Sequence, residues 1–304
     1  MKNKKVAIGI CLCVIGVIMV AIAFLLAGKD WSKLNIGVKY EHLQYVCSED
    51  ATSIVVRENA NKVIIQKGNV DKITVDYCYD KKTLDYTFEE SDSTLSVKRV
   101  AKKFSFFDGI QINFETPKLI ITVPEGKYDN LDVKLTSGSL EISELAVSNI
   151  TVKDTSGSVK LSDIECDTLN VKNTSGVIKL NDITASSIET GSTSGRTDIE
   201  NVETSSICAN VSSGTIKFVN VSADEVNGEA TSGSMKLEKL DVAKAMNLKL
   251  TSGSVSGSVV GAPEDFTIIS NITSGTSNLT NGGTGSKQLN CNVTSGSIKI
   301  KFTS

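Results

Sequence analysis

The tripeptide Thr-Ser-Gly, once varied to Ser-Ser-Gly, recurs nine times between residue 131 and the C-terminus of this 304-residue chain. Its glycines lie 19 residues apart over the first five intervals, and the last three intervals are 20, 22 and 21 residues. A repeat this short is one coil of a solenoid, because such a unit cannot bury its apolar face without stacking on its neighbours. The nine glycines are Gly138, Gly157, Gly176, Gly195, Gly214, Gly233, Gly253, Gly275 and Gly296.

Each repeat alternates apolar and polar residues around its glycine. The position seven residues before the glycine is apolar in all nine repeats, and the positions two and four residues after it are apolar in most. A period of two is typical of strands. We therefore expect a strand entering the Thr-Ser-Gly corner, a strand leaving it, and a polar return such as Asn181-Asp182. Stacked at about 4.8 Å per coil, nine coils would form a rod about 40 Å long.

The chemistry of threonine, serine and glycine explains why these residues occur at the corner. Glycine tolerates the positive φ of a tight corner. The hydroxyls before it can bond the local backbone, or the same hydroxyl one coil away, and so form polar ladders. We interpret the hydroxyl array as structural. The alternative is a threonine array that orders water or holds a ligand. Such an array would be expected on a flat strand face, whereas these residues lie at a glycine corner.

An uncharged, mostly apolar run over residues 6–28 follows three lysines within residues 1–5. About 20 apolar residues cross a bilayer as a helix, so the run is long enough. Lysines on its N-terminal flank place that end in the cytoplasm. We predict a cytoplasmic tail, an uncleaved single-pass signal anchor in the cell membrane, and an extracytoplasmic remainder; a cleaved signal peptide is the alternative.

The remainder divides into three parts. Residues 29–49 form a polar linker, residues 50–130 break into short alternating runs without a strict repeat, and residues 131–304 hold the Thr-Ser-Gly coils. We interpret the middle part as the irregular beginning and N-terminal cap of the same stack. The predicted fold class is all-β: a single-chain β-solenoid of about nine 19–22-residue coils with an irregular β N-terminal part, preceded by one transmembrane helix.

Two features are candidate interaction surfaces. One is a basic-aromatic segment with two lysines followed by Phe104, Phe106 and Phe107, which either touches a partner or membrane or covers the end of the core. The other is a pair of lysine rows, because stacking aligns equal positions of successive coils. Such rows either bind an acidic envelope polymer or are a solvated face that prevents aggregation. Lys134, Lys153 and Lys172 lie four residues before the glycine, and Lys160, Lys179, Lys217, Lys236 and Lys299 lie three residues after it.

The charge and the cysteine content limit which classes of partner, metal and cofactor the protein is expected to bind. The formal net charge is −3, and leaving out the four lysines up to Lys29 gives −7, so nucleic acid is an unfavourable partner. Five cysteines outside the apolar run show neither a disulfide framework nor metal-ligand spacing. A bridge between Cys47 and Cys78 stays an open alternative. We expect no metal and no cofactor.

Catalytic chemistry is not expected. The only histidine, His42, lies in the linker, so a histidine-dependent triad within the solenoid is ruled out. The coils are near-minimal and carry no insertions that could build a site. The repeat-region carboxylates occupy different faces, and we interpret each as a turn or solvent residue. These are Asp154, Asp163, Asp182 and Asp198.

The chain resembles the bacterial DUF4097 β-strand-repeat proteins, often labelled adhesins. The resemblance rests on the strand ending in Pro124-Glu125-Gly126, on the segment over residues 131–142 with its Thr-Ser-Gly corner, and on the later coils, and it spans residues 50–304. It implies a β-solenoid, often tethered to a membrane and encoded near envelope-stress functions. It implies no active site.

These observations predict a non-enzymatic, membrane-anchored surface for adhesion, interaction or scaffolding at the bacterial cell envelope. Its partner would be a cell-wall polymer, a host surface or a membrane protein. The alternative is an accessory or sensor protein in an envelope-stress response that acts through a membrane partner. The last coil, residues 297–302, has no evident cap, so end-to-end association is a further expectation.

Overall fold

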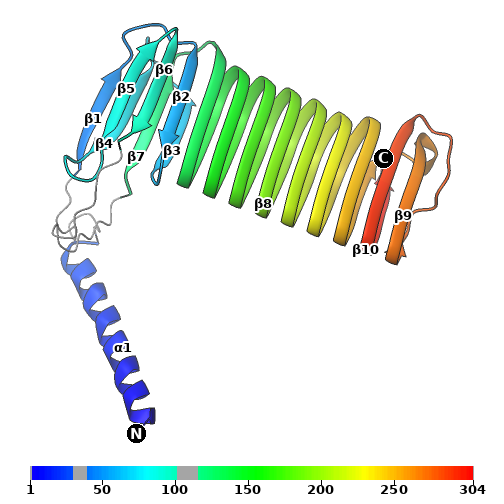
Figure 1. Ribbon diagram of the computed structural model, residues 1–304, viewed down its shortest axis with the longest axis horizontal. Helices are drawn as coiled ribbons and strands as arrows, with labels where there is room; N and C mark the ends of the chain where they lie inside the picture. Colours follow the sequence, from blue (N-terminus) through cyan, green and yellow to red (C-terminus); the bar gives the residue numbers. More distant parts are fainter. Residues whose placement is uncertain (1, 30–39, 101–115, 304) are drawn as a thin grey trace.

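The computed structural model describes residues 2–29, 40–100 and 116–303, with side chains described from residue 13 onward. Helix α1 (Lys2–Leu26) covers most of the predicted anchor and lies outside the rod (Figure 1). In these parts of the chain, no helix combines the length and the apolar character that a membrane span requires. The rest is almost entirely strand, which confirms the all-β prediction.

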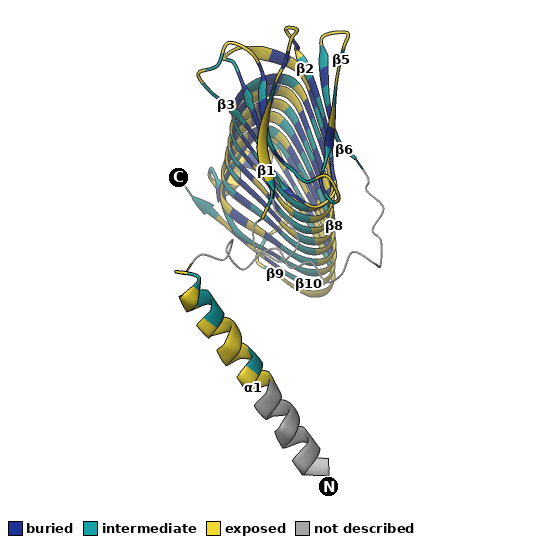
Figure 2. Ribbon diagram, turned by 90° about the vertical axis from the view of Figure 1, so that its left-hand side faces the viewer, coloured by how far each residue is buried: buried dark blue, intermediate teal, exposed yellow. Residues whose placement is uncertain are grey.

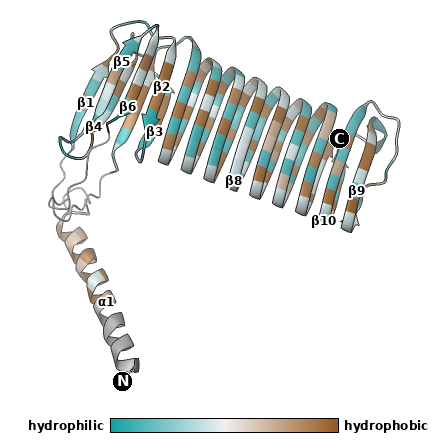
Figure 3. Cartoon of the chain, viewed as in Figure 1, coloured by the Kyte–Doolittle hydropathy of each residue, from teal (hydrophilic) through white to brown (hydrophobic). Residues whose placement is uncertain are grey.

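The rod is built mainly by one continuous element, β8 (Lys127–Val260), which winds through successive coils (Figure 1). Most of its inward positions are apolar and most of its outward positions polar, so brown and teal bands alternate along the coils (Figure 3). The buried apolar residues form a single core, and buried segments recur in successive coils along the axis (Figure 2).

Six of the coils have a second corner and therefore three sides, one more than the sequence analysis predicted. The polar return contains a residue in the left-handed conformation, six residues after the glycine, with φ between 50° and 58°. Beyond it follow two further inward positions, such as Ile164 and Cys166. The return is therefore a second corner followed by a short third side. The corner residues are Glu144, Asp163, Asp182, Asn201, Asn220 and Lys239.

Polar ladders do form along the stack, mainly through asparagine, and hydroxyl pairs such as Thr215 and Ser234 also join neighbouring coils. Among the described residues, no hydrogen bond joins the hydroxyls of one Thr-Ser-Gly corner to those of the next. Instead, Asn201 donates to Asn181 at 3.2 Å and accepts from Asn220 at 3.1 Å. A second ladder joins Asn247 to its equivalents in neighbouring coils. The described residues therefore do not show the predicted hydroxyl ladders within the Thr-Ser-Gly tripeptides, whereas a bond from a corner hydroxyl to backbone, the predicted alternative, joins Ser137 Oγ to Asn59 O at 3.1 Å.

The N-terminal coils are stacked out of sequence order. Strands β2 (Ser53–Glu58) and β3 (Lys62–Lys67) pair in parallel with the first coil of β8. Outside them, β6 (Thr94–Arg99) and β7 (Lys118–Val123) pair in parallel with β2 and β3.

Antiparallel strands cover that end of the stack. Strand β4 (Thr74–Tyr79) pairs with β7, β1 (Glu41–Val46) pairs with β4, and β5 (Tyr86–Ser91) pairs with β6. The change of direction ends the parallel coils.

The last coil in the sequence is not the last coil in space. Strand β10 (Lys287–Thr303) lies between the final coil of β8 and strand β9 (Phe266–Ser277), which follows the short 3-10 helix η3 (Pro263–Asp265). The Asn278 side chain donates to Ile300 O at 2.7 Å and accepts from Ile300 N at 2.9 Å. Strand β9 thus covers residues 297 and 298 and Asn278 covers Ile300, so this edge is partly capped, and end-to-end association stays a prediction.

The strand register also excludes a disulfide between Cys47 and Cys78. Cys78 faces His42 across β1 and β4, whereas Cys47 directly follows Val46, which faces Thr74. Five residues along a strand separate the two cysteines by about 17 Å, far beyond the reach of a disulfide. No bridge joins them.

Candidate functional site

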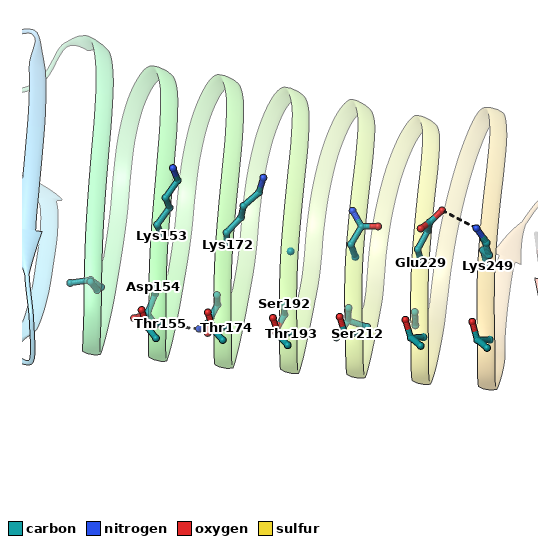
Figure 4. Close-up of a pocket in the computed structure, with 18 of the residues that line it drawn as sticks. Lys153, Asp154, Thr155, Lys172, Thr174, Ser192, Thr193, Ser212, Glu229 and Lys249 are labelled. Carbon is teal, nitrogen blue, oxygen red and sulfur yellow. Dashed lines mark hydrogen bonds and ion pairs between the residues drawn. The ribbon is translucent and has the colours of Figure 1, made fainter.

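A groove of about 650 Å³ runs along one side of the solenoid, next to the Thr-Ser-Gly corner (Figure 4). Lys134, Lys153 and Lys172 line it from three successive coils and are exposed, as their equal positions in the repeat predicted. In the next coil this position is Gly191, so the row has a gap there. Lys249 stands near the far end of the groove.

Only part of this lysine row is neutralised within the chain. Lys172 pairs with Glu189 at 3.0 Å, and Lys249 pairs with Glu229 at 3.9 Å. For Lys134 and Lys153, the described part of the chain provides no ion pair. The half of the groove that comes first in the sequence, with Lys134 and Lys153, therefore carries the unneutralised positive charge.

The other predicted surface residues lie elsewhere. Lys160 and Lys179 are exposed but belong to the side that leaves the corner, so they do not line the groove. The structure thus brings the first three lysines together and separates them from these two. Phe104, Phe106 and Phe107 fall within residues 101–115, outside the described residues.

Hydroxyl groups line the groove on the corner side. Thr155, Thr174, Thr193 and Thr231 stand two residues before their glycines and occur once in each coil, with Ser212 at the equivalent position between them. Hydroxyls both donate and accept hydrogen bonds, whereas the lysine ammonium groups only donate. The groove can therefore bind anionic groups on one side and polar, uncharged groups on the other.

At the floor of the groove, three polar residues that line it occupy an inward column that is apolar in other coils. Asp154, Asn173 and Ser192 each stand three residues before their glycine, where Leu135 and Val211 are buried. Asp154 is 5% exposed, and burial raises the pKa of its carboxyl group although the Ser156 and Thr155 backbone N–H groups bond to it.

This buried column corrects the interpretation of Asp154 as a turn or solvent residue. Asp198 is also buried, at 2% exposure, and accepts a hydrogen bond from Arg196 at 2.6 Å. The sequence analysis missed the column because it counted apolar residues at other positions. Leu135, Val211, Ala230 and Leu250 were the signal that this column points inward.

The described residues contain no group of three or more His, Cys, Asp and Glu side chains placed to hold a metal ion. His42 lies in the cap on β1, with its Nδ1 3.7 Å from Cys78 Sγ. Burial raises the pKa of the Cys166 and Cys291 thiols to about 12, so neither is a nucleophile at neutral pH.

Comparison with solved structures supports the fold. A "putative adhesin" from Bacteroides fragilis is 15% identical and superposes with a TM-score of 0.50, over 86% of this chain and 97% of that one. Another "putative adhesin", from Parabacteroides distasonis, is 12% identical with a TM-score of 0.45 and the same coverage. A comparison with curated proteins gives no match.

A protein-family model supplies the assignment. The model described as Toastrack DUF4097 matches residues 51–301, which is most of the chain and all of the coils. The match agrees with the resemblance carried by the Thr-Ser-Gly repeat. This chain therefore belongs to the Toastrack DUF4097 family.

Proposed function

We propose that this protein is a non-enzymatic, membrane-anchored component of the bacterial cell envelope whose solenoid is an extracytoplasmic surface for adhesion or interaction. Within that surface, the lysine row of the groove binds an acidic envelope polymer. The observation that carries the proposal is the alignment of Lys134, Lys153 and Lys172 on one groove. An extended anionic chain lying along the axis meets one ammonium group in each of three coils.

Further observations support the two parts of the proposal. Val14, Ile15 and Val17 of α1 are more than half exposed, which favours a lipid environment for this helix. The Bacteroides fragilis protein of the same fold is described as an adhesin, in keeping with a non-enzymatic role. A rod that stands away from its anchor presents its sides to surrounding polymers.

Retention of the detergent-solubilised full chain on isolated cell wall, host matrix and membrane protein tests the proposal. The key variant is Lys134→Gln/Lys153→Gln/Lys172→Gln, and the matched control is Lys236→Gln/Lys299→Gln/Lys301→Gln, which changes the net charge equally. We expect wall or matrix to retain the wild type and the control, and to release the key variant. If a single membrane protein is recovered with the wild type and with both variants, polymer binding is contradicted. The protein would then be an accessory of that membrane partner.

A further inference from the structure

The charges at the left-handed second corner are opposite to those of the groove, coil by coil. The first three coils have a lysine four residues before the glycine, the groove position, and a carboxylate six residues after it, the corner position. In the next two coils both positions are uncharged, and in the sixth both signs are reversed. In coil order, the two positions hold Lys134 and Glu144, Lys153 and Asp163, Lys172 and Asp182, Gly191 and Asn201, Asn210 and Asn220, and Glu229 and Lys239.

The groove and corner positions do not neutralise each other within one chain. In the part of the chain that the structure describes, no ion pair links the two positions of any coil, and the charged side chains at both are exposed. Lys172 pairs with Glu189 and Glu229 pairs with Lys249, in exposed contacts that contribute little. The match of opposite charges therefore does not stabilise the single chain.

The shape of the coil places the two positions on opposite sides of the rod. The groove position lies on the side that enters the Thr-Ser-Gly corner, where Figure 4 shows Lys153 and Lys172 in line. The second corner joins the other two sides, and in a three-sided coil such a corner lies opposite the remaining side. A hollow of about 430 Å³ beside this corner is lined by five carboxylates and one lysine. Over the same coils, one side of the rod is therefore positive and the opposite edge negative.

We propose that this protein associates side by side with further copies of itself, with the second corner of one rod lying along the groove of the next. A sideways shift without rotation brings each coil opposite the same coil of its neighbour, so every charged position meets the opposite charge. Such a contact joins two different surfaces, so it repeats and gives an open row of parallel rods. The inference rests on the proposed membrane anchoring, which gives all copies the same direction and height.

Confinement to a membrane makes an exposed contact of this kind sufficient. A single exposed ion pair contributes little and is screened by salt. Anchored copies share one orientation and a high effective concentration, so several weak pairs act together. The groove lysines also bind the acidic polymer of the proposed function, so a polymer in the groove and a neighbouring rod exclude each other.

Charge reversal in the full chain, reconstituted in phosphatidylcholine vesicles at low salt, tests the contact. A carbodiimide joins a carboxylate to an amine only where the two touch, and the products are read as a ladder of oligomers on denaturing gels. The native Lys239, with φ 53°, shows that the corner position accepts lysine. The groove variant is Lys134→Glu/Lys153→Glu/Lys172→Glu, and the corner variant is Glu144→Lys/Asp163→Lys/Asp182→Lys.

We expect the wild type to give the ladder and to lose it at high salt. Each variant alone should lose the ladder, and an equal mixture of the two should regain it, because each then offers the charge that the other needs. In a mixture of isotope-labelled and unlabelled wild type, mass spectrometry should find Lys134 joined to Glu144, and Lys153 joined to Asp163, of a different copy. The control Lys236→Glu/Lys299→Glu/Lys301→Glu changes the net charge as much as the groove variant and should keep the ladder.

The proposal is overturned if the wild type gives no ladder, if the single variants keep it, or if the mixture does not restore it. A chain that does not float with the vesicles contradicts the anchor and, with it, the contact. Polymer binding is read separately, because the corner variant keeps the groove lysines and should bind a soluble acidic polymer as the wild type does. Loss of polymer binding with an intact ladder would contradict the polymer function alone.

Discussion

At the scale of single residues, two separate constraints require glycine at each Thr-Ser-Gly corner. Its φ lies between +118° and +152°, where a residue with a Cβ is strained. Its neighbour in the stack imposes the second requirement, because a Cβ on Gly195 would lie 2.0 Å from Gly176 O. Repetition of this contact at every coil explains why the glycine never varies in this chain.

Gly195→Ala should therefore destabilise the solenoid by about 3 kcal/mol or more, since backbone strain and a clash with main-chain atoms add. Gly191→Ala is the control in the same coil, because its Cβ would meet only Lys172 Cγ at 3.7 Å and its φ is not in the positive region. Denaturant unfolding of both variants measures the difference. Equal midpoints for the two would contradict the close stacking of the corners.

Glu58 joins several parts of the N-terminal cap through buried hydrogen bonds. It is 1% exposed and accepts hydrogen bonds from the Tyr86 hydroxyl, from backbone N–H groups and from Arg99. Burial by itself raises the pKa of this carboxyl, but the hydrogen bonds from Tyr86, Ala60 N–H and Arg99 outweigh it and hold the pKa below its ordinary value.

A lowered pKa gives the stability of the cap a defined pH dependence. The ionised Glu58 stabilises the fold above its unfolded pKa, and this contribution is lost as the pH falls through the folded pKa. Glu58→Gln should lower stability at pH 7 by about 3–5 kcal/mol, because Arg99 loses its buried partner. Unfolding midpoints followed from neutral to acidic pH should show a shallower acid loss in the variant, and parallel curves would contradict this role.

At the scale of elements, the period of two and the spacing of 19 residues were enough to predict the coil. Both follow from rules that the sequence expresses directly: inward residues are apolar, and a corner with positive φ needs glycine. The third side was missed because its two inward positions follow a left-handed residue such as Asp163 that looks like an ordinary turn. The alignment of Lys134, Lys153 and Lys172 followed from their spacing, but the groove did not, because it is lined by side chains from several coils.

The asparagine ladder at the left-handed corner should contribute both conformation and hydrogen bonds. Asn201→Gly keeps the left-handed conformation and removes the bonds to Asn181 and Asn220, whereas Asn201→Ala removes both contributions. We expect a loss of about 1–2 kcal/mol for glycine and about 1 kcal/mol more for alanine. Chemical unfolding checks the order, and a glycine variant no more stable than the alanine variant would show that the conformation contributes nothing.

At the scale of the whole molecule, the order of the coils could not be predicted from the sequence. The coils are nearly equivalent, so nothing in the repeat decides that β10 inserts between β8 and β9, or that β2 and β3 lie inside β6 and β7. These exchanges place the irregular strands at one end of the rod and the loop around Asn278 at the other. The order of the coils is fixed only by strand pairing between elements that are far apart in the sequence.

The thiol of Cys208 can report on which side of the membrane the solenoid lies in intact cells. Cys208 is half-buried on the outward side, whereas Cys47, Cys78, Cys166 and Cys291 are buried in the folded domain. A membrane-impermeant maleimide should label the protein before lysis, and Cys208→Ser should remove the label. Labelling that requires lysis would place the solenoid on the other side of the membrane.

The salt dependence of binding to a soluble acidic polymer tests the central claim most directly. Fluorescent polygalacturonate is titrated with the full chain across a series of NaCl concentrations, and log K is plotted against log salt. Each ammonium contact with a flexible polyanion releases about 0.7 counterions, so the Lys134→Gln/Lys153→Gln/Lys172→Gln variant should lose about two units of slope. The Lys236→Gln/Lys299→Gln/Lys301→Gln control should keep the wild-type slope, and an equal loss in both variants would contradict a specific lysine row.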